Sequence, residues 1–313
     1  MTGSRCHNQA NVLGVTIDPT PAGPPANESD IQLRPLLFSI AYRMTGSVSE
    51  AEDLVQETYL RVHDGEQRGT EIESRRAYAC TVITRLSIDY LRSARVHREE
   101  YVGEWLPEPI VTDRESDPAE RAVLSESLSM AFLVLLERLS PPERAVLLLR
   151  DVFGYGFGEV AELIGKSEAN CRQLAVRARR AVQEGQPRFE SSVEKRWALA
   201  ERFFSAIEAG DTDGLANLLA ADAVLYGDGG GKVAARRTPL RGGIEAARFL
   251  VNLGRLGRAD GLVLTMVDVN GQPGAIVQAS SGETVAVLSL DIADGCVYAV
   301  RSVSNPDKLG HLV

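Results

Sequence analysis

Arginine residues that could bind phosphate groups and read base edges gather in two segments of this chain. Residues 75–98 hold six arginines against the single acid Asp89, and residues 166–180 hold five basic residues against Glu168. Arginine and lysine neutralise backbone phosphates, while bidentate arginine and glutamine side chains distinguish bases in the major groove. The two segments therefore indicate nucleic-acid binding.

The net charge of −9 does not exclude this interpretation, because the acidic residues are concentrated between the two basic segments. Residues 99–143 contain eleven acidic residues and three basic ones. Two basic patches separated by an acidic connector are compatible with a protein that binds nucleic acid.

The second basic segment lies on a predicted helix-turn-helix. Apolar residues at helical spacing predict one helix over 157–164, and Gly165 suits a left-handed C-cap. Ser167 is the expected N-cap of a second helix, which would enter the major groove. Its buried face is predicted to hold Cys171, Leu174, Ala175, Ala178 and Val182, and its outward face Arg172, Gln173, Arg177 and Arg180.

The first basic segment lies on the last of three predicted helices. The first helix covers residues 36–44 and ends at Gly46. The second begins after Ser49 as its N-cap and ends before a loop at 64–73. The third is predicted to carry Tyr78, Val82, Leu86 and Tyr90 on its apolar face and Arg85, Asp89 and Arg92 on another.

The rest of the chain is predicted to contain a linker, more helices and a set of strands. The proline-containing acidic stretch 103–122 is the linker, and residues 124–138 form a fourth helix. Ser140 and Pro141 are the expected N-cap and first residue of the next helix. From about residue 193, a long helix ends at Gly210, and residues 261–303 alternate as three or four antiparallel strands. Helices followed by strands indicate an α+β domain.

Several function classes lack their sequence signals. No run of about 18 apolar residues predicts a membrane helix, and the N-terminus lacks a secretory signal, so we expect a cytoplasmic protein with no membrane partner. The cysteines Cys6, Cys80, Cys171 and Cys296 lie far apart and form no zinc-binding pattern. We expect reduced thiols and neither a metal site nor a cofactor.

The order of motifs resembles a known family. Residues 35–98, with DLVQETYLRV at 53–62, resemble region 2 of the sigma-70 family, and residues 124–183 resemble region 4. The C-terminal part resembles SnoaL-like domains of the NTF2-like superfamily. Three segments match the extracytoplasmic-function (ECF) sigma factors that carry such an extension: WLPEP at 105–109, DGGGK at 228–232 and NPDKL at 305–309.

The resemblance implies a multidomain fold, with two all-α sigma domains followed by an α+β cone-shaped domain. The expected parts are a disordered tail (1–30), a region 2 domain (31–100), a linker (101–123), a region 4 domain with the helix-turn-helix (124–186) and a SnoaL-like domain (193–313). The implied function is that of an alternative sigma factor, which directs RNA polymerase to particular promoters. Its partners would be the β′ and β subunits of the core polymerase and promoter DNA.

The resemblance also assigns roles to individual residues. Polymerase binding would fall to Asp53, Gln56 and Glu57, and contacts to the −10 element to Arg76, Tyr78, Arg85, Tyr90, Arg92 and Arg95. Contacts to the −35 element would fall to Ser167, Arg172, Gln173, Arg177, Arg179 and Arg180. The regulatory contacts between domains would involve Trp105, Leu106, Pro107, Asp228, Lys232, Asn305, Pro306, Asp307, Lys308 and Leu309.

Some alternatives remain open at this point. Tyr78 and Tyr90 suit either base stacking or a core, and WLPEP suits either a docking peptide or a small apolar core. The C-terminal domain could be an enzyme or a sensor that binds a small-molecule ligand. Residues 193–310 contain no histidine. No obvious catalytic partner exists in this segment for its aspartates Asp222, Asp228, Asp268 and Asp291. We therefore expect no catalytic residue.

Overall fold

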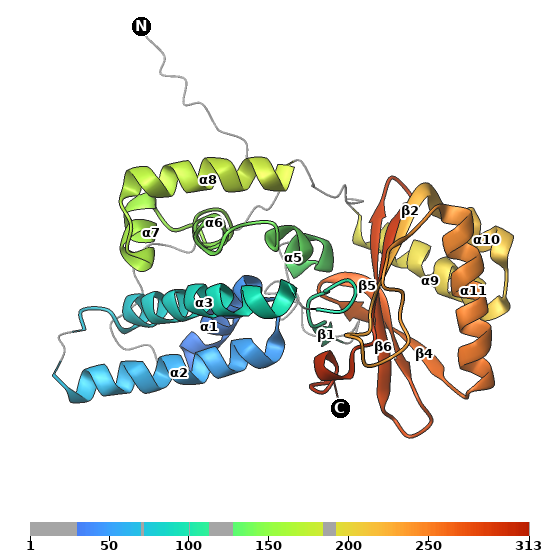
Figure 1. The fold of residues 1–313 in the computed structure, drawn as a ribbon, viewed down its shortest axis with the longest axis horizontal. Coiled ribbons are helices and arrows are strands. Elements are labelled where there is room, and N and C mark those ends of the chain that lie inside the picture. The colour runs from blue at the N-terminus through green and yellow to red at the C-terminus, as the bar shows by residue number, and fades with distance from the viewer. Residues whose placement is uncertain (1–29, 70–71, 100, 113–127, 184–191, 313) are drawn as a thin grey trace, which may run out of the picture.

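The structure is a computed structural model that describes residues 30–69, 72–99, 101–112, 128–183 and 192–312. Figure 1 shows a helical half, built from the N-terminal residues, beside a half in which a sheet is covered by helices. Residues 1–29 of the predicted tail (1–30) and residues 113–123 of the predicted linker (101–123) lie outside the described residues, whereas Asp30 is helical.

The first helical domain consists of α1 (Asp30–Thr45), α2 (Val48–Gln67) and α3 (Arg75–Glu99). The N-cap of α2 is Ser47 and not Ser49, because the Ser47 hydroxyl accepts the Glu50 amide. The loop predicted at 64–73 is also wrong at its start, since α2 continues to Gln67. Gly65 is buried and lies against Tyr78 of α3, so packing between the helices extends α2 by a turn.

The buried face of α3 differs from the predicted one. Its deepest residues include Cys80, Ile83 and Ser87, all with no exposed surface. The four residues expected on the apolar face, Tyr78, Val82, Leu86 and Tyr90, are only half-buried. The spacing is helical as predicted, but the face turned to α1 and α2 is rotated, because the small residues around Ile83 allow a closer approach.

The second helical domain follows the linker, which contributes the short strand β1 (Val111–Thr112). The fourth predicted helix is shorter than expected where it is described, as α5 (Met130–Leu136). The Ser140 capping box and Pro141 are confirmed at the start of α6 (Pro141–Leu147), which continues into the π-helix η2 (Leu148–Val152).

The helix-turn-helix is confirmed as α7 (Phe157–Ile164) and α8 (Glu168–Gln183). Gly165 ends α7 with a φ of 67°, in the left-handed region that glycine adopts at little cost. The Asn170 amide donates to the Ser167 hydroxyl, which confirms Ser167 as the N-cap of α8. All five residues predicted for the inner face of α8 are buried.

The C-terminal domain has the expected α+β architecture. It begins with α9 (Val193–Ala209) and α10 (Thr212–Ala216), and α11 (Gly243–Ala259) follows later. The strands are β2 (Leu219–Asp228), β3 (Leu240–Arg241), β4 (Val263–Val269), β5 (Gln272–Gln278), β6 (Thr284–Ala293) and β7 (Cys296–Val303), and the 3₁₀ turn η3 (Pro306–Lys308) comes last. The four predicted antiparallel strands are β4–β7; β2, β3 and α11 were not predicted.

The sheet joins the two halves of the molecule. Its strand order is β1-β4-β5-β6-β7-β2-β3, so the linker strand β1 is an edge strand of the C-terminal sheet, with Val111 opposite Val269. One cluster of buried apolar side chains lies between the sheet and α9, α10 and α11. A second cluster joins the strands to Leu106 of the linker, Met130 of α5 and Leu309 near the C-terminus. The sheet is therefore packed between its own helices and the helical half (Figure 1).

Candidate functional site

One exposed face of α2 carries the residues predicted to bind polymerase. Asp53 and Gln56 are exposed, and Glu57 is half-buried and pairs with Arg61 at 2.8 Å. Leu60 lies one turn beyond Gln56 and is 63% exposed, so this face presents an apolar side chain beside polar ones. The sequence interpretation missed Leu60, because a single leucine on the outer face of a helix is common and does not by itself mark a binding surface.

The arginines of α3 do not all face solvent. Arg85 donates from Nε and Nη2 to the carbonyl oxygens of Leu163 and Glu162, each at 3.2 Å, at the C-terminal end of α7. A cation at this end of a helix is favoured by the helix dipole. Arg92 pairs with the exposed Asp89 at 3.0 Å. The side chain of Arg95 lies outside the described part of the structure.

Further contacts join the two helical domains. The Tyr155 hydroxyl lies 3.5 Å from Cys80 Sγ of α3 and is also hydrogen-bonded to Arg76. Burial raises the pKa of the Tyr155 hydroxyl. Arg144 of α6 donates to the Met44 carbonyl of α1 at 2.5 Å. We call these contacts, together with those of Arg85, the helical boundary. Tyr78 and Tyr90 pack against the buried cluster that runs through both helical domains.

The outward face of α8 is available for a ligand. Arg172, Gln173 and Arg180 are exposed, and Val176, between them, is 65% exposed. Arg172 pairs with Glu168 and lies over the Phe157 ring, which orients its guanidinium. Val176 was not predicted, yet an apolar side chain on a reading helix can contact a thymine methyl group.

Two other arginines of α8 pair with acidic residues of the same domain. Arg179 binds Asp151 of η2 with two hydrogen bonds, at 2.5 and 2.8 Å, and this contact raises its pKa. Arg177 pairs with Glu143 of α6 at 2.9 Å. Both residues therefore help to fix α8 on α6 and η2.

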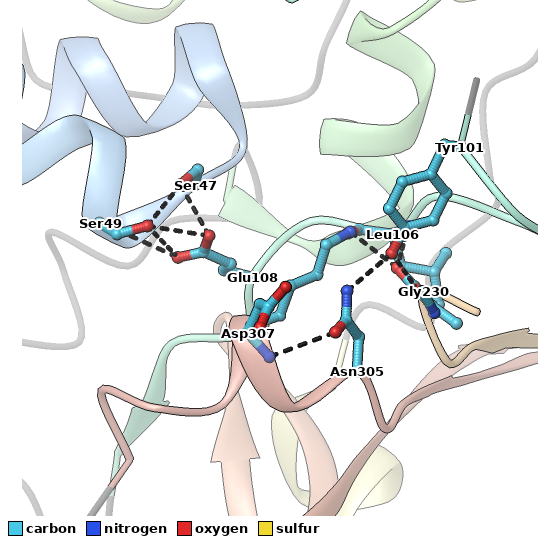
Figure 2. A network of polar contacts seen from close by, with 10 residues as sticks. Ser47, Ser49, Tyr101, Leu106, Glu108, Gly230, Asn305 and Asp307 are labelled. Carbon is cyan, nitrogen blue, oxygen red and sulfur yellow. Dashed lines mark hydrogen bonds and ion pairs between the residues drawn. The ribbon is translucent and has the colours of Figure 1, made fainter. Parts of the chain in front are cut away.

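The three segments WLPEP, DGGGK and NPDKL converge on one buried ion pair (Figure 2). Lys308 Nζ lies 2.7 Å from Asp228 Oδ2, and both residues are more than 90% buried. Lys308 also donates to the Leu106 carbonyl at 2.5 Å, and the Leu106 amide donates to Asp228 at 2.8 Å. Tyr101 and the Gly230 amide donate to the other oxygen of Asp228. We call this arrangement the clasp.

Aromatic rings and a second ion pair surround the clasp. Lys308 Nζ lies 4.2 Å from the centre of the Trp105 ring, which itself covers Gly46 at the end of α1. Asn305 donates to the Tyr101 hydroxyl at 2.9 Å, and burial raises the pKa of this hydroxyl, as does its hydrogen bond to Asp228. At the surface, Lys232 pairs with Asp307 at 2.5 Å.

The linker residue Glu108 connects the clasp to α2. Its buried carboxylate accepts the backbone amides of Val48 and Ser49, at 2.7 and 3.1 Å, and the hydroxyls of Ser47 and Ser49. Figure 2 shows this carboxylate pointing at the first turn of α2. A negative charge here satisfies unpaired amides and interacts favourably with the helix dipole. WLPEP is thus both a docking peptide and part of a small apolar core.

Asn270, in the turn between β4 and β5, joins three parts of the chain. Its Nδ2 donates to the Tyr42 hydroxyl of α1 at 2.7 Å and to the Leu128 carbonyl at 3.0 Å, and its Oδ1 accepts the Ile110 amide. The residue is fully buried, with a φ of 55° that asparagine tolerates better than most residues. Nothing local in the sequence marked Asn270, because an Asn-Gly pair predicts only a turn.

Comparisons with known proteins agree with this arrangement. Residues 31–96 match the family model for sigma-70 region 2, and residues 129–182 match the model for sigma-70 region 4. The chain is 40% identical over 291 residues to the ECF RNA polymerase sigma factor SigJ of Mycobacterium tuberculosis, an alignment that covers 88% of this chain and 90% of SigJ. The chain belongs to the ECF sigma factors.

Two further comparisons extend the likeness over the C-terminal domain of this ECF sigma factor. The crystal structure of SigJ from Mycobacterium tuberculosis aligns with a TM-score of 0.71 and 36% identity, covering 89% of this chain and 96% of that one. A probable ECF sigma factor of the same species, SigI, is 31% identical and covers 89% of this chain and 93% of its own length. In this sigma factor, region 2 comprises α1–α3, and region 4 comprises α5–α8.

Two features are absent from the described residues. None of their helices is long and apolar enough to span a membrane. They contain no group of three or more histidine, cysteine, aspartate or glutamate side chains placed to hold a metal ion.

Proposed function

We propose that the exposed face of α2 binds the β′ subunit of core polymerase through Asp53, Gln56 and Leu60. The observation that supports this role is that Leu60 is exposed on the same helix as the exposed polar residues Asp53 and Gln56. Replacing Asp53 and Gln56 by alanine should weaken association with core polymerase, as measured by pull-down. The matched control is Asp64→Ala with Gln67→Ala, two exposed residues further along α2. Equal retention of both double variants would contradict the assignment.

We further propose that α8 reads the −35 element through Arg172, Gln173 and Val176. Arg172→Ala should relax the sequence preference at one or two base pairs, by about 1–3 kcal/mol for a lost bidentate contact. Arg180→Ala should weaken binding to all sequences. It should also reduce the slope of the logarithm of the binding constant against the logarithm of salt concentration by about one. Binding curves across promoter variants and salt concentrations separate the two roles, and identical behaviour of the two variants would refute them.

For promoter binding, the helical boundary has to open. The −10 and −35 elements are about 25 base pairs apart, or about 85 Å at 3.4 Å per step. In the structure α3 and α7 are in contact, and Arg85 and Arg76, proposed to bind the −10 element, contact region 4 instead. We therefore propose that this compact arrangement is the resting form, and that region 4 leaves α3 when polymerase and promoter bind.

The C-terminal domain is proposed to tune this opening and not to catalyse a reaction. Its interior between the sheet and α9–α11 is formed by apolar side chains such as Phe203, Phe204 and Leu290. The buried Asp291 is paired with Arg301 and so is not poised as a base. The clasp instead fixes the domain to the linker that separates the two sigma regions. We place this activity in the cytoplasm, where RNA polymerase acts.

Truncation tests the tuning role. A chain ending after Ser304 loses Lys308 and so disturbs the clasp, whereas a chain ending after residue 191 loses the domain entirely. The first should leave a misplaced domain and the second a free linker, so the two should differ in promoter-dependent transcription from each other and from the full chain. Identical transcription from all three at equal protein level would contradict the proposal.

A further inference from the structure

A hollow lies beside the clasp, where the linker meets the loop that follows β2. Its volume is about 230 Å³, and its walls come from Val102 and Gly103 of the linker and from Gly227, Gly229, Gly231 and residues 233–237 of the C-terminal domain. The two walls approach closely, since a Cβ on Gly231 would lie 3.1 Å from the Val102 side chain.

The charged residues that line this hollow are all basic. Arg236 and Arg237 line it, and no acidic residue does. Among the described residues, neither arginine forms an ion pair. The Arg236 guanidinium lies 5.5 Å from the centre of the Phe249 ring, which holds it in place, while its Nε is buried without a hydrogen-bond partner. An anion in the hollow would therefore bind the terminal guanidinium nitrogens of Arg236, which are not among the buried atoms without a partner.

The remaining walls suit a small organic anion. Val102 and Val233 add apolar surface to the walls of the hollow. The glycine Gly229 lets the loop fold closely on itself, since a Cβ there would lie 2.7 Å from Ala235. A guanidinium binds carboxylate or phosphate oxygens in a bidentate manner. The volume lies below that of a typical drug-sized site, which favours a compact molecule.

We propose that this hollow binds the carboxylate or phosphate group of a small metabolite, with Arg236 and Arg237 as its cationic partners. A ligand there contacts the linker and the C-terminal domain together, so it stabilises their association next to the clasp. This regulatory consequence rests on the proposed tuning role, but the binding itself does not. Regulation would then reach the sigma regions through the linker and not through the domain interior.

The test measures the melting temperature of the full-length chain during titration with sodium phosphate and, separately, sodium benzoate. Sodium chloride at matched ionic strength is the reference. The wild type should show a rise in melting temperature with at least one of the two anions that exceeds the rise in chloride and grows with the logarithm of the anion concentration. An excess with phosphate alone or with benzoate alone identifies the favoured head group. A rise no larger than that in chloride with either anion overturns the proposal, because ionic strength alone then explains it.

Variants make the test specific. Arg236→Gln with Arg237→Gln should weaken the apparent affinity at least tenfold, whereas Arg248→Gln with Arg255→Gln, which removes the same charge from the exposed side of α11, should not. Val233→Trp should fill the hollow and abolish the rise in excess of chloride while both arginines remain. Equal affinity in all variants would overturn the site. This test uses the chain without polymerase or DNA, so it reports on anion binding alone. The proposed tuning role is tested separately by the truncation experiment.

Discussion

The clasp and the helical boundary are both contacts between domains, but they treat buried charge differently. In the clasp, Lys308 and Asp228 compensate each other, and backbone and tyrosine donors satisfy the remaining carboxylate oxygen. At the helical boundary, the almost fully buried Arg144 pairs with Glu137 at 2.8 Å, but its Nε has no hydrogen-bond partner, and burial lowers its pKa to about 9. The lowered pKa means that the charged form is disfavoured there.

This difference indicates which contact is lasting and which can be released. A buried charge with all its partners is costly to separate, whereas one with an unsatisfied donor gains hydration when the contact opens. We therefore expect the C-terminal domain to stay attached to the linker and region 2, while region 4 separates from region 2.

Breaking the clasp should have the largest effect on stability. Lys308→Met leaves Asp228 buried without its counter-charge and should destabilise the chain by about 3–5 kcal/mol. Lys232→Met, which removes an exposed ion pair from the same network, should cost less than about 1 kcal/mol. Denaturant unfolding of the two variants gives both values, and similar losses would contradict the account of the clasp.

The second-largest loss of stability should follow from removing the Asn270 side chain, which joins three parts of the chain in a three-way junction. Asn270→Gly keeps the left-handed backbone but leaves the Leu128 carbonyl and the Ile110 amide without their partner, at a cost of about 2 kcal/mol. Asp294→Gly, at the exposed left-handed turn between β6 and β7, is the matched control and should change stability little. If the control lost as much stability as Asn270→Gly, backbone conformation and not the junction would be the cause.

Glu108→Gln tests the connection between linker and α2. It removes the negative charge from the helix start while keeping one acceptor oxygen, so the expected loss is about 1–2 kcal/mol, with weaker binding to core polymerase. Glu104 lies in the same linker and has no hydrogen bond to a described residue. Glu104→Gln should therefore change the free energies of unfolding and of polymerase binding by no more than about 0.5 kcal/mol. Unchanged unfolding and polymerase binding in Glu108→Gln would show that this contact does not support α2.

The smallest effect on stability is expected at the helical boundary. Tyr155→Phe removes the hydrogen bonds to Cys80 and Arg76 and should cost about 1 kcal/mol. Because the substitution weakens the helical boundary, it should nevertheless increase the separation of region 4 from region 2. It changes no proposed DNA-contacting residue, so binding to promoter DNA should rise. Tyr298→Phe, at an exposed tyrosine of β7, is the control. Tighter packing of the two regions in Tyr155→Phe would contradict this expectation.

Sequence patterns predicted the elements whose signals are local. Ser140, Ser167 and Gly165 mark helix ends through capping, and they lie where the sequence placed them. The helix α11 was missed because Gly254 and Gly257 weaken a helical pattern. Packing explains their presence, since a Cβ on Gly254 would lie 2.6 Å from Ile207 of α9.

The direction of a side chain depends on tertiary structure. The basic faces of α3 and α8 could be predicted, but not that Arg85 would contact α7 or that Arg179 would bind Asp151. The three interdomain segments were identified by resemblance, whereas their meeting at Lys308 and Asp228 required the fold. Asn270 and Leu60 gain significance only from burial and exposure, respectively.

The most direct test measures two distances in the full chain by pulsed electron paramagnetic resonance, before and after addition of core polymerase. Spin labels at the exposed positions Arg68 and Gln183 report on region 2 against region 4, and labels at Arg68 and Glu283 report on region 2 against the C-terminal domain. The account predicts that the first distance lengthens by tens of ångströms while the second stays the same. An unchanged first distance, or an equal increase in both, would contradict it.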